Sequence, residues 1–318
     1  MTLSPRLAAY PDHVLPLTNQ QVNARDRVKL KLLDGTYSTE TAACFCGEEG
    51  GVVIAERDRY GLPVTTVLCP WCGLMRTSPR MTAATTAKFY EEDYRDLYSI
   101  ASRKEDTFKE QITRGGQLRD TLAPLLKDVQ NVYEIGCGAG GILVPFAEAG
   151  MRVAGCDLGD EYLELGRAHG LDLIQGDVSD LLCSRGELAD LVILSHVAEH
   201  FLDLREELKK VVEAVVPGGL LLVVVPGIWS IRTAYRGDIL LYLQNAHTFH
   251  FSGKTLAFVL QSIGLDVLFV DEQAVAIAGR PTNPQNNGSF VPMPKGEPTR
   301  VLRFLADTEK SWLEQFAQ

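Results

Sequence analysis

Four cysteines in the first quarter of the chain have the spacing of a metal site. Cys44 and Cys46 form one pair, and Cys69 and Cys72 form a second pair after twenty-two intervening residues. Each pair can place two sulfurs on one ion, and a hairpin between the pairs would bring them together. Because Zn²⁺ prefers a closed tetrahedron of thiolates in structural sites, we predict a structural zinc ion here. Two disulfides or four free thiols are the alternatives, and disulfides require an oxidising compartment.

A glycine-rich segment further along the chain has the pattern of a ligand-binding loop. The apolar run 132–135 is followed by Gly136, Gly138, Gly140 and Gly141. Glycines after a strand let the backbone approach a ligand closely. The spacing fits two kinds of loop, because Gly136, Gly138 and Gly141 also match the dinucleotide-binding pattern.

Polar residues follow the next three apolar runs of the same region. Asp157 can accept hydrogen bonds from both hydroxyls of a ribose, and its alternative role is a helix N-cap. Asp177, followed by Val178, can accept a bond from an adenine amino group, and it too can be a cap. Ser195 ends the fourth run. Ligands of parallel sheets bind beyond the carboxyl ends of the strands, so we expect these groups to converge there.

The elements that must position these residues alternate between apolar strands and helices. Strands are predicted at 132–135, 152–156, 173–174, 191–195 and 220–225, and helices at 142–149, 161–169, 203–216 and 254–263. Such alternation is typical of a parallel sheet covered on both faces. Two final strands, at 266–270 and 274–278, are too close in sequence for a helical crossover and should pair antiparallel. We therefore predict an α/β fold: a Rossmann-like parallel sheet with a final antiparallel strand, plus a small N-terminal four-cysteine zinc module.

Composition excludes several classes of partner. The 318 residues contain 31 Lys and Arg against 41 Asp and Glu, a net charge of −10. Nucleic-acid binders usually have a basic surplus, so we predict no nucleic-acid partner. No apolar run reaches the roughly 18 residues that a membrane span needs. The N-terminus also lacks the basic start and apolar core of a secretory signal, so we expect a cytoplasmic protein.

Taken together, the second half of the chain resembles class I S-adenosylmethionine-dependent methyltransferases. The resemblance is carried by Glu134-Ile135-Gly136-Cys137-Gly138-Ala139-Gly140, Asp157, Gly176-Asp177, His196-Val197-Ala198-Glu199-His200 and Pro217-Gly218-Gly219. It implies S-adenosyl-L-methionine as cofactor and a small-molecule acceptor as partner. The residues expected to bind the cofactor are Glu134, Gly136, Gly138, Gly140, Asp157, Asp177, Val178 and Ser195.

The first half of the chain adds a narrower resemblance. The cysteine module and the following Phe89-Tyr90-Glu91-Glu92-Asp93-Tyr94 are similar to the zinc-binding domain that precedes methyltransferases of nucleotide-linked deoxysugars. His247-Thr248-Phe249-His250-Phe251-Ser252 is also similar to that group. The resemblance implies a sugar, nucleotide sugar or glycan precursor as acceptor.

The length of the chain bears on which acceptor atom is methylated. Sugar C-methyltransferases of this type carry a further C-terminal domain, whereas this chain ends at Gln318, so we expect O-methylation. C-methylation of a nucleotide keto-sugar and methylation of another natural product are the alternatives.

Transfer to a hydroxyl requires a general base near neutrality, and histidine suits that role. Because they follow the fourth strand or precede the 254–263 helix, we predict three catalytic residues: His196, Glu199 and His247. Tyr90, Tyr94 and His250 are the predicted acceptor contacts, and His200 is expected to point elsewhere. Structural histidines, aromatic packing and, for His250, a helix cap are the alternatives.

These expectations divide the chain into five parts. They are an N-terminal arm at 1–40, a zinc-binding module at 41–80, a helical linker or lid at 81–127, a methyltransferase domain at 128–280, and a C-terminal loop and helix at 281–318. Two functions of other classes share some of the same features. An NAD(P)-dependent oxidoreductase would use the loop and Asp157, and a non-catalytic adaptor would use the zinc module alone.

Overall fold

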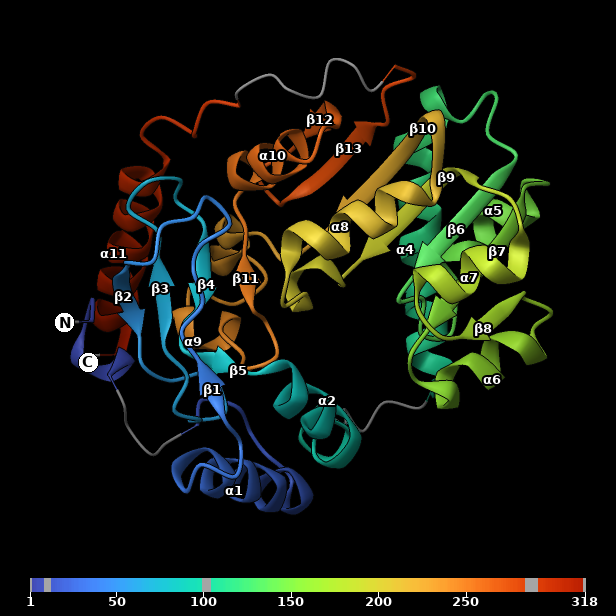
Figure 1. Cartoon of the computed structure of the whole chain (residues 1–318). Helices are drawn as coiled ribbons and strands as arrows, with labels where there is room; N and C mark the ends of the chain where they lie inside the picture. Colours follow the sequence, from blue (N-terminus) through green and yellow to red (C-terminus); the bar gives the residue numbers. More distant parts are fainter. Residues whose placement is uncertain (1, 9–12, 99–103, 284–290, 317–318) are drawn as a thin grey trace.

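Two sheets dominate the computed structural model, which describes residues 2–8, 13–98, 104–283 and 291–316 (Figure 1). The first part of the chain forms most of a small antiparallel sheet, and the second half forms a larger, mostly parallel sheet. No helix of these described ranges is both long and apolar enough to cross a membrane.

The large sheet carries the predicted ligand-binding residues. Its strands are β6 (Asn131–Ile135), β7 (Arg152–Asp157), β8 (Leu173–Gln175), β9 (Ala189–Ser195), β10 (Val215–Val224), β12 (Asp266–Val270) and β13 (Val275–Gly279). Within the described residues these seven strands run in the order β12-β13-β10-β9-β6-β7-β8. Strands β6 to β10 pair in parallel, whereas β13 is antiparallel to both β10 and β12. The predicted fold class, including the final antiparallel pairing, is confirmed.

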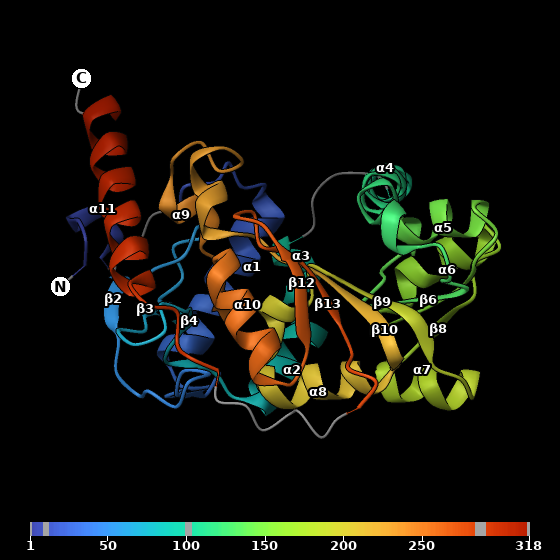
Figure 2. The same cartoon turned by 90° about the horizontal axis from the view of Figure 1, so that it is seen from above.

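Helices cover both faces of this sheet (Figure 2). They are α4 (Lys104–Leu122), α5 (Val144–Glu148), α6 (Asp160–Ala168), α7 (Val178–Arg185), α8 (Leu204–Glu213) and α10 (Gly253–Ser262). Alternate residues of β9 face opposite sides, because side chains alternate along a strand. Val192 and Leu194 join the core under α7, α8 and α10, whereas Leu191 and Ile193 join the core under α4, α5 and α6.

One predicted helix end is wrong. The helix expected over 203–216 ends at Glu213, and Pro217-Gly218-Gly219 lie inside β10. The register of β10 against β9 shifts between Val215 and Leu220, which marks a bulge. The amide of Gly218 donates to the carbonyl of Arg280 just after β13, so the glycines extend the strand pairing.

The small sheet is antiparallel and draws one strand from the second half of the chain. Its order is β11 (Phe249–His250), β4 (Met75–Thr77), β3 (Thr66–Leu68) and β2 (Val52–Ala55). A separate ribbon pairs β1 (Thr39–Glu40) with β5 (Arg80–Met81). Because β11 follows β10 in the chain, it ties the predicted zinc module to the predicted methyltransferase domain.

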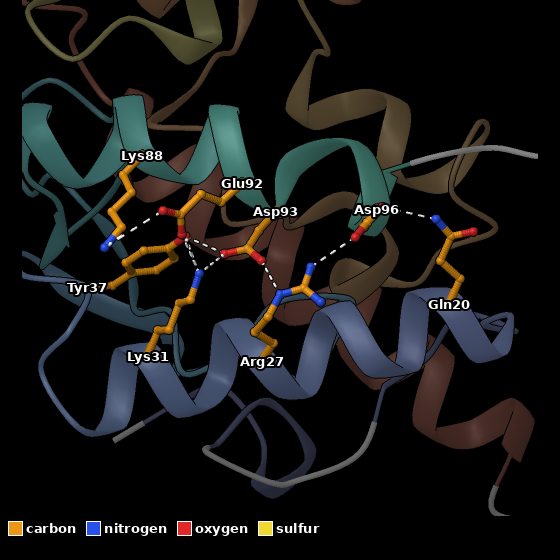
Figure 3. A network of polar contacts seen from close by, with 8 residues as sticks. All are labelled: Gln20, Arg27, Lys31, Tyr37, Lys88, Glu92, Asp93 and Asp96. Atoms are coloured by element: carbon orange, nitrogen blue, oxygen red, sulfur yellow. Dashed lines mark hydrogen bonds and ion pairs between the residues drawn. The ribbon is translucent and has the colours of Figure 1, made fainter.

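Helix α1 (Asn19–Leu33) is joined to α2 (Ala83–Glu92) and α3 (Tyr94–Tyr98) by a polar network centred on Asp93 (Figure 3). The buried Asp93 carboxylate accepts hydrogen bonds from Arg27 and Lys31 of α1 and from the hydroxyl of Tyr37. Three donors on one carboxylate hold the two helical segments in a fixed relation.

Residues 2–8 lie beside the C-terminal helix of the described chain (Figures 1 and 2). Arg6 forms ion pairs with Asp238, which caps α9 (Ile239–Tyr242), and with Glu309 of α11 (Glu297–Phe316). Leu7, beside it, is fully buried in the same apolar core as Leu305. The first residues of the N-terminal arm are therefore packed against α11, whereas α1 of the same arm docks on α2 and α3.

Candidate active site

The glycine loop after β6 needs residues without a side chain. Gly136, Gly138 and Gly140 all have positive φ, a region that other residues rarely adopt. At Gly136 a Cβ atom would also come within 2.4 Å of a methyl group of Val197. The loop is thus brought directly against the segment that follows β9.

Asp157, at the end of β7, fixes the shape of this loop. Its Oδ2 accepts a hydrogen bond from the Gly138 amide at 2.9 Å, and its Oδ1 accepts one from the Gly159 amide at 2.8 Å. The N-cap of α6 is Gly159, so Asp157 does not serve as the cap that was its alternative role. A ribose contact at Asp157 stays a prediction.

Asp177 is a helix cap in this structure. Its Oδ1 accepts hydrogen bonds from the amides of Ser179 and Asp180 at the start of α7. Both bonds use the same oxygen, which leaves Oδ2 for a ligand. Val178, the first residue of α7, is buried beside it. Their contact with an adenine stays a prediction.

Two buried polar groups near the loop have no hydrogen-bond partner among the described residues. They are Oε2 of Glu134 in β6 and Oγ of Ser195 at the end of β9. Burial, with the nearby charge of Asp157, raises the pKa of Glu134 well above its ordinary value. Unpartnered buried polar atoms are rare in folded proteins and indicate a ligand or an ordered water. A cofactor that offers hydrogen-bond donors fits this position.

The segment after β9 carries a strained histidine beside a buried carboxylate. His196 is one of the few described non-glycine residues with positive φ, at 59°. Its Nδ1 lies 3.4 Å from Oε1 of Glu199, whose side chain is 1% exposed. Strained backbone of this kind concentrates at functional sites.

His200 joins the same cluster, although we expected it to point elsewhere. Its Nδ1 lies 2.9 Å from the carbonyl oxygen of Ala246 and 3.2 Å from the hydroxyl of Tyr90. Because the carbonyl can only accept, Nδ1 carries the proton and Nε2 is the unprotonated nitrogen of the neutral ring. Burial lowers the pKa of His200. The sequence prediction did not include the three-residue helix Ala198–His200. Its tight turn lets Glu199 and His200 reach the same cluster.

His247 approaches the cluster from the loop before β11. Its Nε2 is 4.0 Å from Oε1 of Glu199, and its ring centre is 4.8 Å from that of His200. The backbone is held on both sides, since the Thr77 hydroxyl donates to the His247 carbonyl and the Thr248 amide donates to the Glu199 carbonyl. Burial, followed by the charges of the neighbouring histidines, lowers the pKa of His247 well below its ordinary value.

His250 lies behind His247, in β11. Its ring is 5.9 Å from the His247 ring and 5.2 Å from the Tyr242 ring, between centres. Neither ring nitrogen has a partner among the described residues, and burial lowers the pKa to about 3. The N-cap of α10 is Ser252, so His250 does not cap that helix. A direct acceptor contact at His250 stays a prediction.

Three tyrosines form a row along α2 and α3. Ring centres are 4.5 Å apart between Tyr90 and Tyr94 and 4.6 Å apart between Tyr94 and Tyr98. The Tyr98 hydroxyl donates to Asn245, so the row lies close to the histidine cluster at both ends. Burial, followed by the charges of Tyr94, Glu199 and Asp157, raises the pKa of Tyr90. The Tyr90 end of the row therefore contacts the histidine cluster directly.

The four predicted metal ligands form one compact cluster. The sulfur atoms of Cys44, Cys46, Cys69 and Cys72 all lie within 4.8 Å of one another, and none is in a disulfide. Two of the separations are 3.5 and 3.6 Å. Zinc–sulfur bonds of about 2.3 Å in a tetrahedron put the sulfurs roughly 3.8 Å apart, so the cluster fits a zinc ion.

A buried arginine orders the first cysteine pair. Arg76 of β4 donates to the carbonyl of Ala42 and to those of Glu49 and Gly50, on either side of Cys44 and Cys46. Sequence reasoning gave no role to this residue, because an arginine in a strand of three residues has no distinctive pattern.

The cysteine cluster also contacts the large sheet's helices. The Phe45 ring, between the first two cysteines, packs edge-on against Phe258 of α10 at 5.9 Å. The guanidinium of Arg205, in α8, lies 4.0 Å from the Phe45 ring centre. The cluster therefore shares a core with the helices that cover the large sheet.

Comparison with known proteins decides the family. Residues 108–270 match the family model described as a methyltransferase domain, which is about half of the chain.

The chain belongs to this methyltransferase domain family.

The predicted class I S-adenosylmethionine-dependent methyltransferase domain is thereby confirmed, and the match favours it over an NAD(P)-dependent oxidoreductase.

Curated relatives resemble part of the methyltransferase domain. Two ubiquinone biosynthesis O-methyltransferases match: that of Chelativorans sp. is 31% identical over 97 residues, and that of Brucella anthropi is 34% identical over 110 residues. These matches cover 29% and 33% of this chain and 38% and 44% of the relatives. The chain thus spans less than half the length of the curated relatives it matches.

Among solved structures, an S-adenosylmethionine-dependent methyltransferase from Archaeoglobus fulgidus is similar, with a TM-score of 0.44 and 19% identity. The similarity covers 55% of this chain and 97% of that one.

Proposed function

We propose that the protein transfers the methyl group of S-adenosylmethionine to a hydroxyl of a small polar acceptor. The observation that carries this proposal is the contact between the glycine loop and the histidine segment. Val197 lies against Gly136, so a donor at the loop would face His196 and Glu199 at the same edge of the sheet. Holding donor and acceptor in line supplies much of the rate of such a transfer.

The donor would be held by the residues around the glycine loop. The Glu134 carboxyl, which has an unpartnered oxygen, is placed to accept from the amino group of the donor. Asp157 would accept from the ribose hydroxyls, and Oδ2 of Asp177 would accept from the adenine. When bound, S-adenosylmethionine supplies a methyl carbon already activated by its sulfonium.

The proton of the acceptor hydroxyl would pass to His196. Its side chain is 41% exposed, and Glu199 lies on the Nδ1 side of the ring. That arrangement leaves Nε2 for the acceptor and lets the carboxylate stabilise the ring once it is protonated. The acceptor oxygen held beside His196 would receive the methyl group of S-adenosylmethionine as the carbon–sulfur bond breaks, with that electron pair staying on sulfur.

Oxygen is the acceptor atom that we favour, and the first acceptors to test are sugars and glycan precursors. The curated relatives are named as O-methyltransferases, which supports oxygen as the acceptor atom. The compact four-cysteine cluster supports the sequence resemblance to sugar methyltransferases with a zinc module. The tyrosine row offers flat faces and hydroxyls for a polar acceptor of that size.

A zinc ion held by the cysteine cluster would be structural. All four ligands would be thiolates, which leaves no position open for a substrate. Its effect would be to fix β4, which begins three residues after Cys72 and pairs with β11 beside His247.

The test is a screen of acceptors with S-adenosylmethionine and zinc-loaded protein, beginning with nucleotide sugars. We expect one acceptor class to gain a methyl group on oxygen, as read by mass spectrometry and NMR, with stoichiometric S-adenosylhomocysteine. His196→Gln should lower turnover by about 10²- to 10⁴-fold. His169→Gln is the matched control, because His169 is exposed at the C-terminal end of α6. Methylation of a carbon atom, or equal turnover by His196→Gln, would overturn the proposal.

A further inference from the structure

A second group of metal-ligand residues lies on the acceptor side of the methyltransferase domain. One carboxylate oxygen of Glu199 and one ring nitrogen each of His200 and His247 lie within 4.8 Å of one another. The three residues come from two separate segments, the helix after β9 and the loop before β11. Their convergence is therefore a product of the fold and not of sequence proximity alone.

The Glu199 carboxylate lacks the partners that a buried charge requires. Its side chain is 1% exposed, and neither oxygen accepts a hydrogen bond from the described residues. In the described part of the chain its ion-pair contacts are to two imidazoles, His196 at 3.4 Å and His247 at 4.0 Å. Burying an uncompensated carboxylate is strongly unfavourable, so a cation at this position would stabilise it.

A hydrogen bond orients the His200 ring as a ligand, and a backbone contact fixes the position of His247. The Nδ1–H of His200 donates to the Ala246 carbonyl, which leaves Nε2 with its lone pair for a cation. Metal-binding histidines are usually fixed in this way by a second hydrogen bond on the ring. The amide nitrogen of Gln244, whose oxygen accepts from Arg59, lies against both ring nitrogens of His247, so it would have to move aside for a cation to bind there.

We propose that Glu199, His200 and His247 bind a divalent transition-metal cation that in turn binds the acceptor hydroxyl. This inference rests on the proposed function and deepens it. Two imidazoles and one carboxylate suit Mn²⁺, Fe²⁺, Co²⁺ or Zn²⁺, whereas Mg²⁺ and Ca²⁺ prefer oxygen ligands alone. Three protein ligands leave positions open, as in catalytic metal sites.

The cation would acidify the hydroxyl that is methylated. Coordination lowers the pKa of a bound hydroxyl or water strongly, so the oxygen becomes a better nucleophile. The proton would still pass to His196, which contacts Glu199 but is not one of the three ligands. Open positions side by side also favour acceptors with two neighbouring oxygens, such as the vicinal hydroxyls of a sugar.

The test is a titration with Mn²⁺ of the full chain loaded with one equivalent of zinc, which fills the thiolate site first. Loss of the electron paramagnetic resonance signal of free Mn²⁺ reports binding without any acceptor or donor. We expect one Mn²⁺ per chain in the wild type. Glu199→Gln and His200→Asn should each bind at least about tenfold more weakly, and the matched control His169→Gln should bind like the wild type.

Thermal unfolding of each variant shows whether it is folded. Because one variant changes a carboxylate and the other an imidazole, the metal site can still be tested if one of them does not fold. Folded wild-type protein that binds no Mn²⁺, or a folded Glu199→Gln that binds it equally, would overturn the metal site. Failure of the proposed function is distinguishable, because it would appear as no methyl transfer in the acceptor screen whether or not Mn²⁺ binds.

Discussion

Asp157 joins the end of β7 to the glycine loop through the Gly138 amide and to the start of α6 through the Gly159 amide, so it shapes the site that we propose for the donor. Asp157→Ala should weaken S-adenosylhomocysteine binding by roughly 10- to 100-fold, since hydrogen bonds to charged groups contribute about 1.5–3 kcal/mol. Isothermal titration calorimetry measures the change. Asp160→Ala, at an exposed α6 position paired with Arg167, is the control. Equal affinity of Asp157→Ala and wild type would show that the site lies elsewhere.

Substitution of His196 should lower the rate of catalysis without changing the affinity for the donor. Loss of a general base typically lowers kcat by about 10²- to 10⁴-fold. His196→Gln should therefore lose turnover while S-adenosylmethionine affinity stays within the error of the wild type. Single-turnover and binding measurements on the same preparation check both. A large loss of donor affinity together with unchanged single-turnover rate would contradict the assignment.

At the level of residues, the sequence predicted which side chains gather at the metal and loop sites better than it predicted the contacts that each one makes. The four cysteines and the glycines were found because each needs a particular chemistry or backbone conformation at a fixed spacing. The cap formed by Asp177 and the position of His200 depend on where a helix begins and how tightly it turns. Such boundaries carry only weak sequence signals.

The docking of α1 on α2 and α3 depends on one buried carboxylate. Burial opposes ionisation of Asp93, but hydrogen bonds from Lys31, Tyr37 and Arg27 outweigh it and hold the pKa below its ordinary value of 3.8. A lowered pKa in the folded state stabilises the protein above the unfolded-state pKa, and this contribution is lost as the pH falls through the lowered value.

Asp93→Asn should therefore destabilise the protein at neutral pH by roughly 2 kcal/mol, the scale of a charged hydrogen bond. The difference from the wild type should begin to shrink below about pH 4, where the carboxyl of the unfolded wild type takes up its proton, and should be lost once the pH falls through the lowered pKa of the folded state. Urea unfolding at several pH values measures it. Asp96→Asn, at an exposed partner of Arg27, is the control. A difference independent of pH would contradict the account.

At the level of elements, long periodic segments were predicted and short ones were not. The parallel strands β6 to β10 show as continuous apolar runs, because both faces of the sheet are covered. Strand β11 has two residues and no alternation to detect, and it exists because β4 offers an edge for pairing. The bulge in β10 likewise follows from its pairing with Arg280 and not from a local pattern.

The whole molecule should respond to loss of the cysteine cluster, because that cluster shares a core with α8 and α10. Metal binding to such sites is coupled to folding. Cys72→Ser should lose the zinc ion and unfold at a temperature lower by roughly 5 °C or more. S-adenosylhomocysteine binding below that temperature should persist, because β6 and β7 lie outside the small sheet.

Metal analysis and calorimetry of Cys72→Ser check this prediction. The matched control is Cys183→Ser, since Cys183 is exposed and outside the cluster. Wild-type zinc content or wild-type thermal stability in Cys72→Ser would contradict a structural zinc ion.

The contact between the N-terminal segment and α11 could not be predicted from the sequence. Its ion pair joins Arg6 to Glu309, which are nearly the whole length of the chain apart.

The most direct test of the account is calorimetry of the zinc-loaded protein with S-adenosylmethionine, S-adenosylhomocysteine and NAD. The account predicts that the first two bind at one site per chain and that NAD gives no heat of binding. Folded protein that binds neither S-adenosyl ligand, or that binds NAD in their place, would contradict the central claim that this chain is a methyltransferase.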